Sequence, residues 1–300
     1  MRRRITVPLI CVMAAVPWLW FKPATPPQIQ PAEFVSALPL RGNAAWFGGF
    51  SGIELSDDGK RFYLVTDRGH LMTGKLLRQD GQLIGMADVS DQRLVDKDGN
   101  TREFPHTDAE GLALDTQGRL NVSFEHAQRI LRYDTLESDA KWPSYPRAWR
   151  ALPKNGGLEL VAVDAAGTLF TIPEGVANGA WEALVYRRFP ERKWDQPFTL
   201  PLDGDFVPVG GDFGPDGRLY VLERGVYPFA FRSRVRAMTV TDDGLDQIET
   251  LLETPLGRHG NLEGLAVWRD NERRIRLSMV SDNNFLAPLR SEIVEYLIRD

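Results

Sequence analysis

The sequence predicts an all-β fold, a β-propeller in which five small sheets surround an axis. The prediction starts from Asp108–Glu125, where apolar residues alternate with small or polar ones on both sides of the turn-forming Asp115–Gly118. This pattern is typical of two antiparallel strands joined by a tight turn. The hairpin unit recurs along the chain, and helical periodicity is not seen after the first 21 residues. Repeated hairpins without helices indicate a radial array of sheets.

The hairpin unit occurs five times, with a period near 50 residues. The units are Gly52–Asp67, Asp108–Glu125, Leu158–Glu174, Val209–Glu223 and Asn261–Asp282. The turn glycines Gly59, Gly118, Gly167 and Gly217 are separated by 59, 49 and 50 residues, and the fifth turn falls near position 271. One such sheet cannot bury both of its faces, but neighbours stacked around an axis can.

Each unit is expected to supply the two inner strands of a blade. The outer strands are predicted at Leu71–Leu77, Ile84–Ser90, Arg129–Asp134, Ala148–Leu152, Trp181–Arg188, Phe198–Leu200, Arg234–Val240 and Gln247–Leu252. Only Ser291–Ile298 follows the last unit, so Glu33–Leu38 is expected to complete that sheet, which closes the ring and removes an exposed edge. A ring of six blades stays open as an alternative, because Ser90–His106 is long enough to contain part of a further unit.

Composition agrees with one globular domain, residues 32–300, that does not bind nucleic acid. The chain is 43% hydrophobic and 26% charged, and its 27 Gly and 20 Pro suit a fold with many turns. The formal net charge of -5 lacks the basic excess that neutralises nucleic-acid phosphates. We therefore expect a monomer that acts on a small ligand and can hold cations.

The first 31 residues are predicted to be separate from the domain. Met1–Arg4 is basic and Ile5–Phe21 is apolar, a combination typical of export signals. Residues 1–22 are assigned to a signal peptide or an uncleaved membrane anchor, and residues 23–31 to a Pro-rich linker. The domain is expected in the periplasm or outside the cell, with membrane contact only through this segment. Cys11, the only cysteine, lies here, so no disulfide is expected within the domain.

Acidic residues recur at two equivalent places in the hairpin units. The first strands begin with Glu110, Glu159 and Glu263, with Asp212 close by in the fourth unit, and the second strands end with Asp67, Glu125, Glu174, Glu223 and Asp282. Because a hairpin returns to the edge from which it starts, both places lie at the same end of each blade. We expect these acids to gather around the axis on one face of the propeller.

Two units share the pattern His-x-[Asp/Asn]-x-Glu-Gly-Leu. The polar residues of this pattern are His106, Asp108 and Glu110 in one copy and His259, Asn261 and Glu263 in the other. Alternate side chains of an extended chain point the same way, so each copy is expected to form a polar row able to bind a metal ion or transfer protons. Nearby cations able to hold a phosphate or carboxylate through two hydrogen bonds are Arg68, Arg224 and Arg258.

A purely structural interpretation of these residues stays open. A glutamate at the start of an inner strand can brace the neighbouring blade through backbone N–H groups, and the turn aspartates are turn formers first. The sequence contains no Gly-x-Ser-x-Gly elbow, no phosphate-binding glycine loop and no Cys-His zinc pattern. These absences disfavour a serine hydrolase and the common nucleotide and zinc sites.

Several stretches resemble the bacterial phytase-like family, described by an esterase-like activity of phytase. They are Gly49–Ile53 with Thr66–Gly69, Asp108–Asp115, Asp212–Arg224, and Asn261–Ala266 with Ser281–Phe285. The resemblance implies a propeller, secretion, and phosphoester hydrolysis with calcium held by carboxylates. The candidate site residues that it carries over are Asp67, Arg68, Glu110, Asp212, Glu223, Glu263 and Asp282. The chain lacks the Lys and Arg clusters suited to a highly phosphorylated inositol.

The resulting hypothesis is an exported, calcium-dependent hydrolase of phosphoesters or related esters, whose ligand is a small anionic ester or a sugar-like molecule. The expected calcium ligands are Asp67, Asp108, Glu125, Glu159, Glu174, Asp212, Glu223 and Asp282. The expected catalytic residues are His106, His259, Glu110 and Glu263, and the expected ligand-binding residues are Arg68, Arg224, Arg258 and Asn261. Two alternatives stay open: a non-catalytic binding propeller of the cell envelope, and a lactonase-type esterase.

Overall fold

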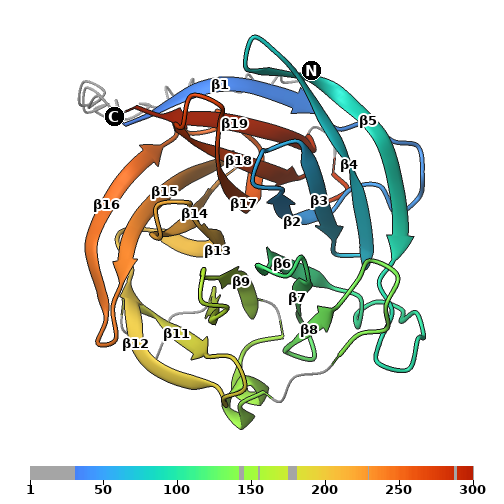
Figure 1. The fold of residues 1–300 in the computed structure, drawn as a ribbon, viewed down its shortest axis with the longest axis vertical. Coiled ribbons are helices and arrows are strands. Elements are labelled where there is room, and N and C mark those ends of the chain that lie inside the picture. Colours follow the sequence, from blue (N-terminus) through green and yellow to red (C-terminus); the bar gives the residue numbers. More distant parts are fainter. Residues whose placement is uncertain are drawn as a thin grey trace, which may run out of the picture.

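The computed structural model describes residues 31–299 except 142–144, 155, 175–180, 229 and 287–288. In this part of the chain, five antiparallel sheets surround a common axis (Figure 1), which confirms the predicted five-bladed propeller. The predicted export segment with Cys11 and the linker up to residue 30 lie outside the described residues. None of the described helices has the length and apolar character needed to cross a membrane.

Each blade is built from consecutive strands, except the last. The first contains β2 (Phe50–Leu55), β3 (Arg61–Thr66), β4 (His70–Gln79) and β5 (Gln82–Arg93), and the second β6 (Ala109–Leu114), β7 (Leu120–Phe124) and β8 (Arg129–Tyr133). The third contains β9 (Leu158–Val163), β10 (Leu169–Pro173), β11 (Glu182–Arg188) and β12 (Asp195–Pro201). The fourth contains β13 (Phe206–Phe213), β14 (Leu219–Tyr227), β15 (Ala230–Val240) and β16 (Leu245–Glu253). The fifth contains β17 (Asn261–Arg269), β18 (Ile275–Asp282), β19 (Glu292–Ile298) and β1 (Ala32–Pro39).

The ring is closed as the sequence predicts. Strand β1 pairs antiparallel with β19, with Ala32 opposite Ile298 and Pro39 opposite Glu292, so the two ends of the described chain share the fifth blade. This pairing covers the edge that β19 would otherwise expose to other chains. The fifth blade therefore depends on residues that are far apart in the sequence.

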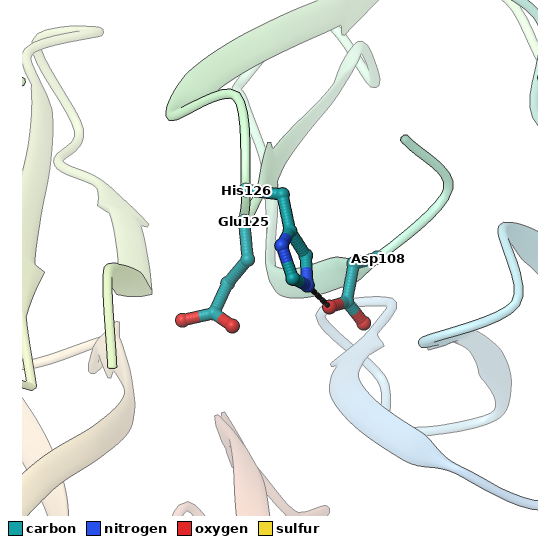
Figure 2. A group of neighbouring side chains, drawn as sticks. All are labelled: Asp108, Glu125 and His126. Carbon is teal, nitrogen blue, oxygen red and sulfur yellow. Dashed lines mark ion pairs between the residues drawn. The ribbon is translucent and has the colours of Figure 1, made fainter. Parts of the chain in front are cut away.

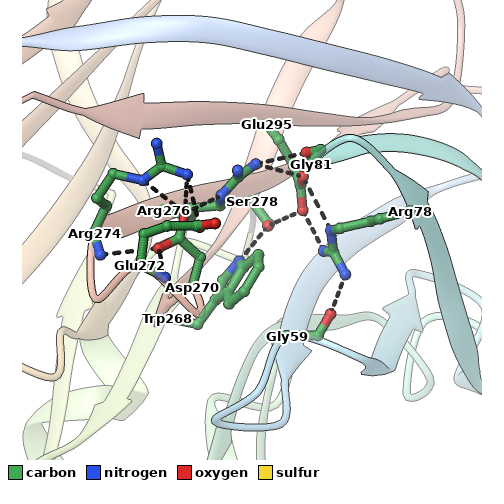
Figure 3. Close-up of polar contacts among 10 residues, drawn as sticks. All are labelled: Gly59, Arg78, Gly81, Trp268, Asp270, Glu272, Arg274, Arg276, Ser278 and Glu295. Carbon is green, nitrogen blue, oxygen red and sulfur yellow. Dashed lines mark hydrogen bonds and ion pairs between the residues drawn. The ribbon is translucent and has the colours of Figure 1, made fainter.

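A buried polar network joins the fifth blade to the first (Figure 3). The carboxylate of Glu295 in β19 is fully buried and accepts hydrogen bonds from Arg78 of β4 and from Ser278 of β18, the latter at 3.0 Å. Arg276 of β18 donates to the carbonyl oxygen of Gly81 in the first blade at 2.8 Å. Because this acid has charged partners, its burial is tolerated, and the network fixes the seam between the last and first blades.

Two details of the predicted architecture are wrong. The expected strand Ala148–Leu152 is replaced by a 3-10 helix, η1 (Arg147–Ala151), and the second blade has three strands. Trp149 in η1 is fully buried against Trp194, with 4.9 Å between ring centroids, so packing of this indole fixes the segment instead of strand pairing. The alternative sixth blade is also wrong, because residues 94–106 form only an isolated bridge between Val95 and Thr101.

The hydrophobic core lies between neighbouring blades. Leu222 of β14 and Leu277 of β18 belong to one buried cluster that spans the fourth and fifth blades, and Phe62 of β3 and Val280 of β18 belong to another that spans the first and fifth. Each sheet thus buries its faces against the next sheet, which is why a single hairpin unit needs its neighbours.

The five inner strands β2, β6, β9, β13 and β17 approach one another closely at the axis. A Cβ atom on Gly111 would lie 2.4 Å from the carbonyl oxygen of Glu159, and one on Gly210 would lie 2.2 Å from that of Glu263. Glycine at these positions lets neighbouring backbones touch. The axis narrows here to a space of about 10 Å³, about the size of one water molecule.

We expect Gly210→Ala to lower the free energy of unfolding by about 1–3 kcal/mol, because the new methyl group overlaps backbone that belongs to another blade. Urea unfolding of the two proteins measures the difference. Gly244→Ala, in the open loop between β15 and β16 with nothing within 4 Å and no left-handed backbone, controls for the loss of a glycine as such. Equal losses in the two variants would contradict the close approach.

Candidate functional site at the carboxylate mouth

The inner hairpin of every blade contains a β-bulge near the start of its first strand. The pairing registers shift between Phe50 and Gly52, Ala109 and Leu112, Ile172 and Pro173, Pro208 and Gly210, and Leu262 and Gly264. The residues at or opposite these shifts are Ser51, Glu110, Glu159, Val209 and Glu263. A bulge re-aims a side chain out of the regular alternation, and bulges are common beside active sites. Three of the five bulges carry glutamates that were predicted as site residues.

A second set of equivalent positions lies on the second strand of each hairpin, one residue beyond the partner of the residue that precedes the bulge. The residues are Asp67, Glu125, Glu174, Arg224 and Asp282, as the register of each hairpin shows. The charge of each acid acts on others of the two sets: Glu110 is influenced by Glu159 and Glu263, and Asp67 by Asp282. The two sets therefore meet at one end of the axis, which we call the carboxylate mouth. The prediction that acids from separate units converge is confirmed for these residues.

Glu223 does not belong to the carboxylate mouth, and its prediction as a metal ligand is wrong. It pairs with Pro208, one position before Arg224, and strand alternation sends neighbouring side chains to opposite faces. Its carboxylate has no exposed surface and binds Arg234, at 2.7 Å from Nε, and Arg236, at 2.9 Å from Nε. Glu223 is a structural residue inside the fourth blade.

Asp212 is also misplaced by the sequence prediction. Val209 occupies the bulge in β13, and Asp212 lies further along the strand, where it pairs with Tyr220 near the hairpin turn. Its Oδ2 accepts the N–H of Val267 at 2.7 Å, so it braces the fifth blade. Together with Glu54 it lines a depression of about 1310 Å³ on the opposite face of the propeller.

Burial and mutual repulsion raise the pKa values of the three bulged glutamates. Burial raises the pKa of Glu110 well above the ordinary range, and the charges of Glu159 and Glu263 add to this effect. The pKa of Glu159 is raised in the same way, by burial and by Glu174 and Glu125. Burial raises the pKa of Glu263 to about 8 although Arg224 opposes the shift. Without a cation, these carboxyl groups resist sharing one site as anions.

Asp67, Asp108 and Asp282 extend the same electrostatic pattern. Burial, followed by the charges of Asp282 and Asp108, raises the pKa of Asp67 to about 7. Burial and Glu125 raise the pKa of Asp108 to about 6. The buried Oδ1 of Asp67 has no hydrogen-bond partner among the described residues. A buried acceptor without a partner is costly in free energy, which points to a ligand or cation at the mouth.

Arg224 is enclosed by the acids of the mouth. Its Nη1 lies 2.5 Å from Glu263 Oε1 and 2.9 Å from Asn261 Oδ1, and its Nη2 lies 2.6 Å from Glu174 Oε1. Asn261 also donates to Glu263 Oε1 at 2.6 Å. The structure therefore brings Arg224 and Asn261 into the site, but the guanidinium already has three partners.

The two histidines of the repeated pattern do not reach the mouth. His259 is buried in the outer part of the fifth blade, where Nε2 lies 2.7 Å from the hydroxyl of Tyr296 and the ring stacks on Phe34. Arg258 lies over the same Phe34 ring at 4.7 Å. His106 is exposed in the turn before β6, and its backbone carbonyl accepts a hydrogen bond from Arg129. The expected roles of His106, His259 and Arg258 at the mouth are wrong.

His126 is the histidine that the structure places at the mouth, and the repeated pattern missed it. Its Nε2 lies 3.1 Å from Asp108 Oδ2, and it directly follows Glu125 (Figure 2). Ligand atoms of Asp108, Glu125 and His126 all lie within 4.8 Å of one another. A sequence signal was available, because Glu125 occupies a predicted acidic position and His126 is its neighbour.

The rim beside the first and fifth blades carries an arginine and an exposed aromatic ring. The guanidinium of Arg68 lies 3.7 Å from the ring centroid of Phe285, and its Nη1 donates to the carbonyl oxygen of Ala45 at 2.8 Å. Phe285 and Asn284 have left-handed backbone, with φ of 50° and 46°, as does His126 at 58°. Such conformations are uncommon outside glycine and gather at functional sites.

The sequence matches the family model for phytase-like proteins, described as "esterase-like activity of phytase", over residues 45–285. The chain belongs to the phytase-like family. The match includes every residue of the carboxylate mouth. It also includes every strand of the five blades except β1 and β19 of the fifth. A comparison with curated proteins finds no match.

Solved structures similar to this phytase-like chain are propellers of low sequence identity. Regucalcin from Agrobacterium tumefaciens, a calcium-binding protein, is 11% identical with a TM-score of 0.51, over 89% of this chain and 96% of that one. A PQQ-bound aldose sugar dehydrogenase from Streptomyces coelicolor is 12% identical with a TM-score of 0.48, over 89% and 98%. A gluconolactonase from Xanthomonas campestris is 14% identical with a TM-score of 0.44, over 83% and 86%. At these identities the likeness concerns the fold.

The side chains of the mouth have the donor chemistry that calcium prefers, although the described group with metal-binding spacing is Asp108, Glu125 and His126 at its edge. Calcium prefers six to eight oxygen ligands, from carboxylates, amide carbonyls and water. The bulged glutamates and Asp282 offer carboxylates within one electrostatic cluster. The amide oxygens of Asn261 and Asn284 lie beside them, where they accept hydrogen bonds from Arg224 and Asn261. The repulsion among these acids and the unpaired Oδ1 of Asp67 are features that a bound cation would relieve.

In chelator, the phytase-like protein is expected to lose stability as the pH rises from about 4 to about 8. Carboxyl groups with raised folded pKa values, such as Asp108 at about 6, Asp67 at about 7 and Glu263 at about 8, hold protons that the unfolded chain releases. The stability that these bound protons contribute is fully present below the pKa values of the unfolded chain. It is lost as the pH rises through the pKa values of the folded protein. Calcium should therefore raise the Tm more at about pH 8 than at about pH 5. A calcium-induced shift that does not depend on pH would contradict this expectation.

Proposed function

We propose that this phytase-like protein is a divalent-cation-dependent ester hydrolase whose site is the carboxylate mouth. The observation that carries the proposal is the convergence of acids from four blades, each with a raised pKa, around one end of the axis. A structural role for these acids would pair each one with a cation or backbone donor. Here the described side chains place one arginine, Arg224, among them.

The cation would be held by Glu110, Glu159, Glu263 and Asp282, which come from three blades. Part of this coordination would run through water, because no three of these carboxylates bring their oxygens within 4.8 Å of one another. A bound calcium ion would supply Lewis-acid polarisation of the ester oxygen and a lowered pKa for bound water. Arg224 would keep Glu263 and Glu174 oriented, because it holds one oxygen of each through short hydrogen bonds. Its removal would free these carboxylates to rotate.

Asp67 is the proposed proton carrier. Its pKa of about 7 suits general acid-base work near neutral pH, and its Oδ1 is free of protein partners among the described residues. The carboxylate packs on the backbone of Gly49, where a Cβ atom would lie 2.2 Å from Oδ1, and the N–H of Asp67 donates to the Gly49 carbonyl at 2.9 Å. These contacts hold the carboxyl group in place while leaving it able to remove a proton from the attacking water.

The charge of the mouth favours a carboxylic ester, including a lactone, over a phosphoester. Of the three arginines expected to hold an anion, Arg224 is engaged by acids and Arg258 lies in the outer fifth blade. Arg68 remains at the rim, beside the exposed ring of Phe285. A substrate with several phosphates would meet an excess of carboxylates, whereas one neutral or singly charged ester would meet Arg68 and an apolar ring.

Export is part of the proposal. The basic Met1–Arg4 and the apolar Ile5–Phe21 support a signal peptide or an anchor, which would place the mouth in the periplasm or outside the cell, where calcium is abundant. The alternative of a non-catalytic binding propeller uses the same mouth without turnover. It is an outcome of the experiment that follows.

The experiment measures hydrolysis by the full-length protein of p-nitrophenyl acetate, γ-butyrolactone and p-nitrophenyl phosphate, with EGTA and with calcium chloride. The proposal predicts calcium-dependent turnover, faster with the carboxylic esters than with the phosphoester. The matched control is Glu110→Gln, which removes one carboxylate at nearly the same volume. Calcium binding without hydrolysis of any ester would favour the binding propeller. Turnover that EGTA does not change would refute the proposed dependence on a cation.

A further inference from the structure

A group of two carboxylates and one imidazole lies at the edge of the carboxylate mouth, in the second blade. Asp108 stands just before β6, and Glu125 and His126 follow β7, so the hairpin of one blade supplies the whole group (Figure 2). Their potential ligand atoms lie within 4.8 Å of one another. Among the described residues, this is the one group of three or more such side chains that meets this spacing. We propose that Asp108, Glu125 and His126 bind a divalent transition-metal ion of the zinc or manganese type.

The imidazole decides the class of metal. Calcium and magnesium prefer oxygen ligands alone, whereas imidazole nitrogen suits zinc and other first-row divalent ions, and carboxylates suit manganese as well. One nitrogen and two carboxylates carry two negative charges when the imidazole is neutral, which matches one divalent cation. Three protein ligands would leave a coordination position for water, the arrangement of catalytic zinc sites.

The three side chains are held in position before any metal binds. Glu125 Oε1 accepts the N–H of Gly157 at 2.6 Å, and the side chain is buried. His126 has a left-handed backbone with φ of 58°, its N–H donates to the carbonyl of Lys154 at 3.2 Å, and its ring meets the edge of Phe104. Asp108 is buried as well. Rigid ligands of this kind lower the entropic cost of binding a metal ion.

The inference goes beyond the proposed hydrolase. The bulged glutamates contain no nitrogen ligand, and the zinc-type site does not need Glu159, Glu263 or Asp282. The two sites are adjacent, because Asp108 stands two residues before Glu110 and its charge helps to raise the pKa of Glu110. Each site can nevertheless be removed separately, at His126 or at Glu263.

The test is calorimetric titration of the EDTA-treated and dialysed full-length protein with zinc chloride and, separately, with calcium chloride. The variant is His126→Asn, because asparagine tolerates left-handed backbone better than most residues. We expect zinc affinity to fall at least about tenfold, the scale found when even an outer partner of a metal ligand is lost. Calcium affinity should stay unchanged. His106→Asn, which removes the exposed histidine of the same region, should leave both affinities unchanged.

Two further measurements keep the inference testable if His126→Asn folds poorly. Glu125→Gln retains an acceptor for the Gly157 N–H and should weaken zinc binding in the same way. Cobalt added to the wild-type protein should give visible absorption bands that either variant lacks. Equal zinc affinity in the wild type and in both variants would overturn the inference, whatever the outcome for calcium. If the wild-type protein binds zinc but does not bind calcium, the proposed hydrolase site is overturned instead.

Discussion

Asp67→Asn is expected to lower kcat for the best ester about 10²–10⁴-fold, the usual contribution of a general acid-base group. The amide keeps the size of the side chain but cannot take a proton from water near neutral pH. KM should change little, because Asp67 is proposed to move a proton and not to hold the substrate. Steady-state kinetics over a pH series measures both parameters.

The pH profile separates this role from a structural one. Burial and the neighbouring acids raise the pKa of Asp67 to about 7 in the absence of a cation, and bound calcium would lower it. The calcium-loaded wild-type enzyme should therefore lose activity on an acidic limb that lies below about pH 7. Asp67→Asn should lack that limb, while its calcium-induced Tm shift is retained. Asp57→Asn, at an exposed turn on the opposite face, is the matched control and should behave as wild type. A profile with the same limb in Asp67→Asn would assign the proton to another group.

Glu223→Ala is expected to lower the free energy of unfolding by about 3–5 kcal/mol, because it leaves two buried guanidinium groups without their shared carboxylate. Glu223 has no exposed surface, and the side chains of Arg234 and Arg236 are 4% and 6% exposed. Water therefore cannot replace the lost partner. Denaturant unfolding measures the change, and calcium binding to the folded fraction should be retained.

Glu249→Ala provides the comparison from the same blade. Glu249 pairs with Arg218 at 3.1 Å, but half of its side chain is exposed, so its loss should cost about 0–1 kcal/mol. A loss for Glu223→Ala no larger than this would show that the buried pair contributes little. A loss of calcium affinity in Glu223→Ala would show that Glu223 contributes to the metal site after all.

The ring of five blades could be predicted because the hairpin repeat and its turn glycines set the period. The closure by β1 followed from the one strand that the fifth blade lacked. The strand predicted at Ala148–Leu152 is wrong, because the burial of Trp149 fixes this segment as a 3-10 helix despite its strand-like composition. Tertiary packing of one large side chain cannot be read from a local pattern.

The site was predicted in outline but misassigned by one residue in the fourth blade. Glu125 and Glu174 each stand seven positions after their turn glycine, and the same count from Gly217 gives Arg224 and not Glu223. A shift of one residue along a strand turns the side chain from the carboxylate mouth to the interior of the blade. Counting from the turn would have predicted an arginine among the acids.

The histidines were misassigned for a different reason. Alternation of side chains holds within a strand, but β6 begins at Ala109 and β17 at Asn261, so His106 and His259 precede the extended segments. Their contacts are set by the turn and by the outer strands. His126 reaches the mouth through left-handed backbone, a conformation that the sequence pattern does not signal.

The central claim is that acids from separate blades share one cation at the mouth. The most direct measurement is an anomalous difference map from crystals of the protein grown with terbium, a calcium substitute that scatters X-rays anomalously. The account predicts a peak at the mouth, bounded by Glu110, Glu159 and Glu263. A map with no peak there, or with a peak only beside Glu54 and Asp212 on the opposite face, would contradict it.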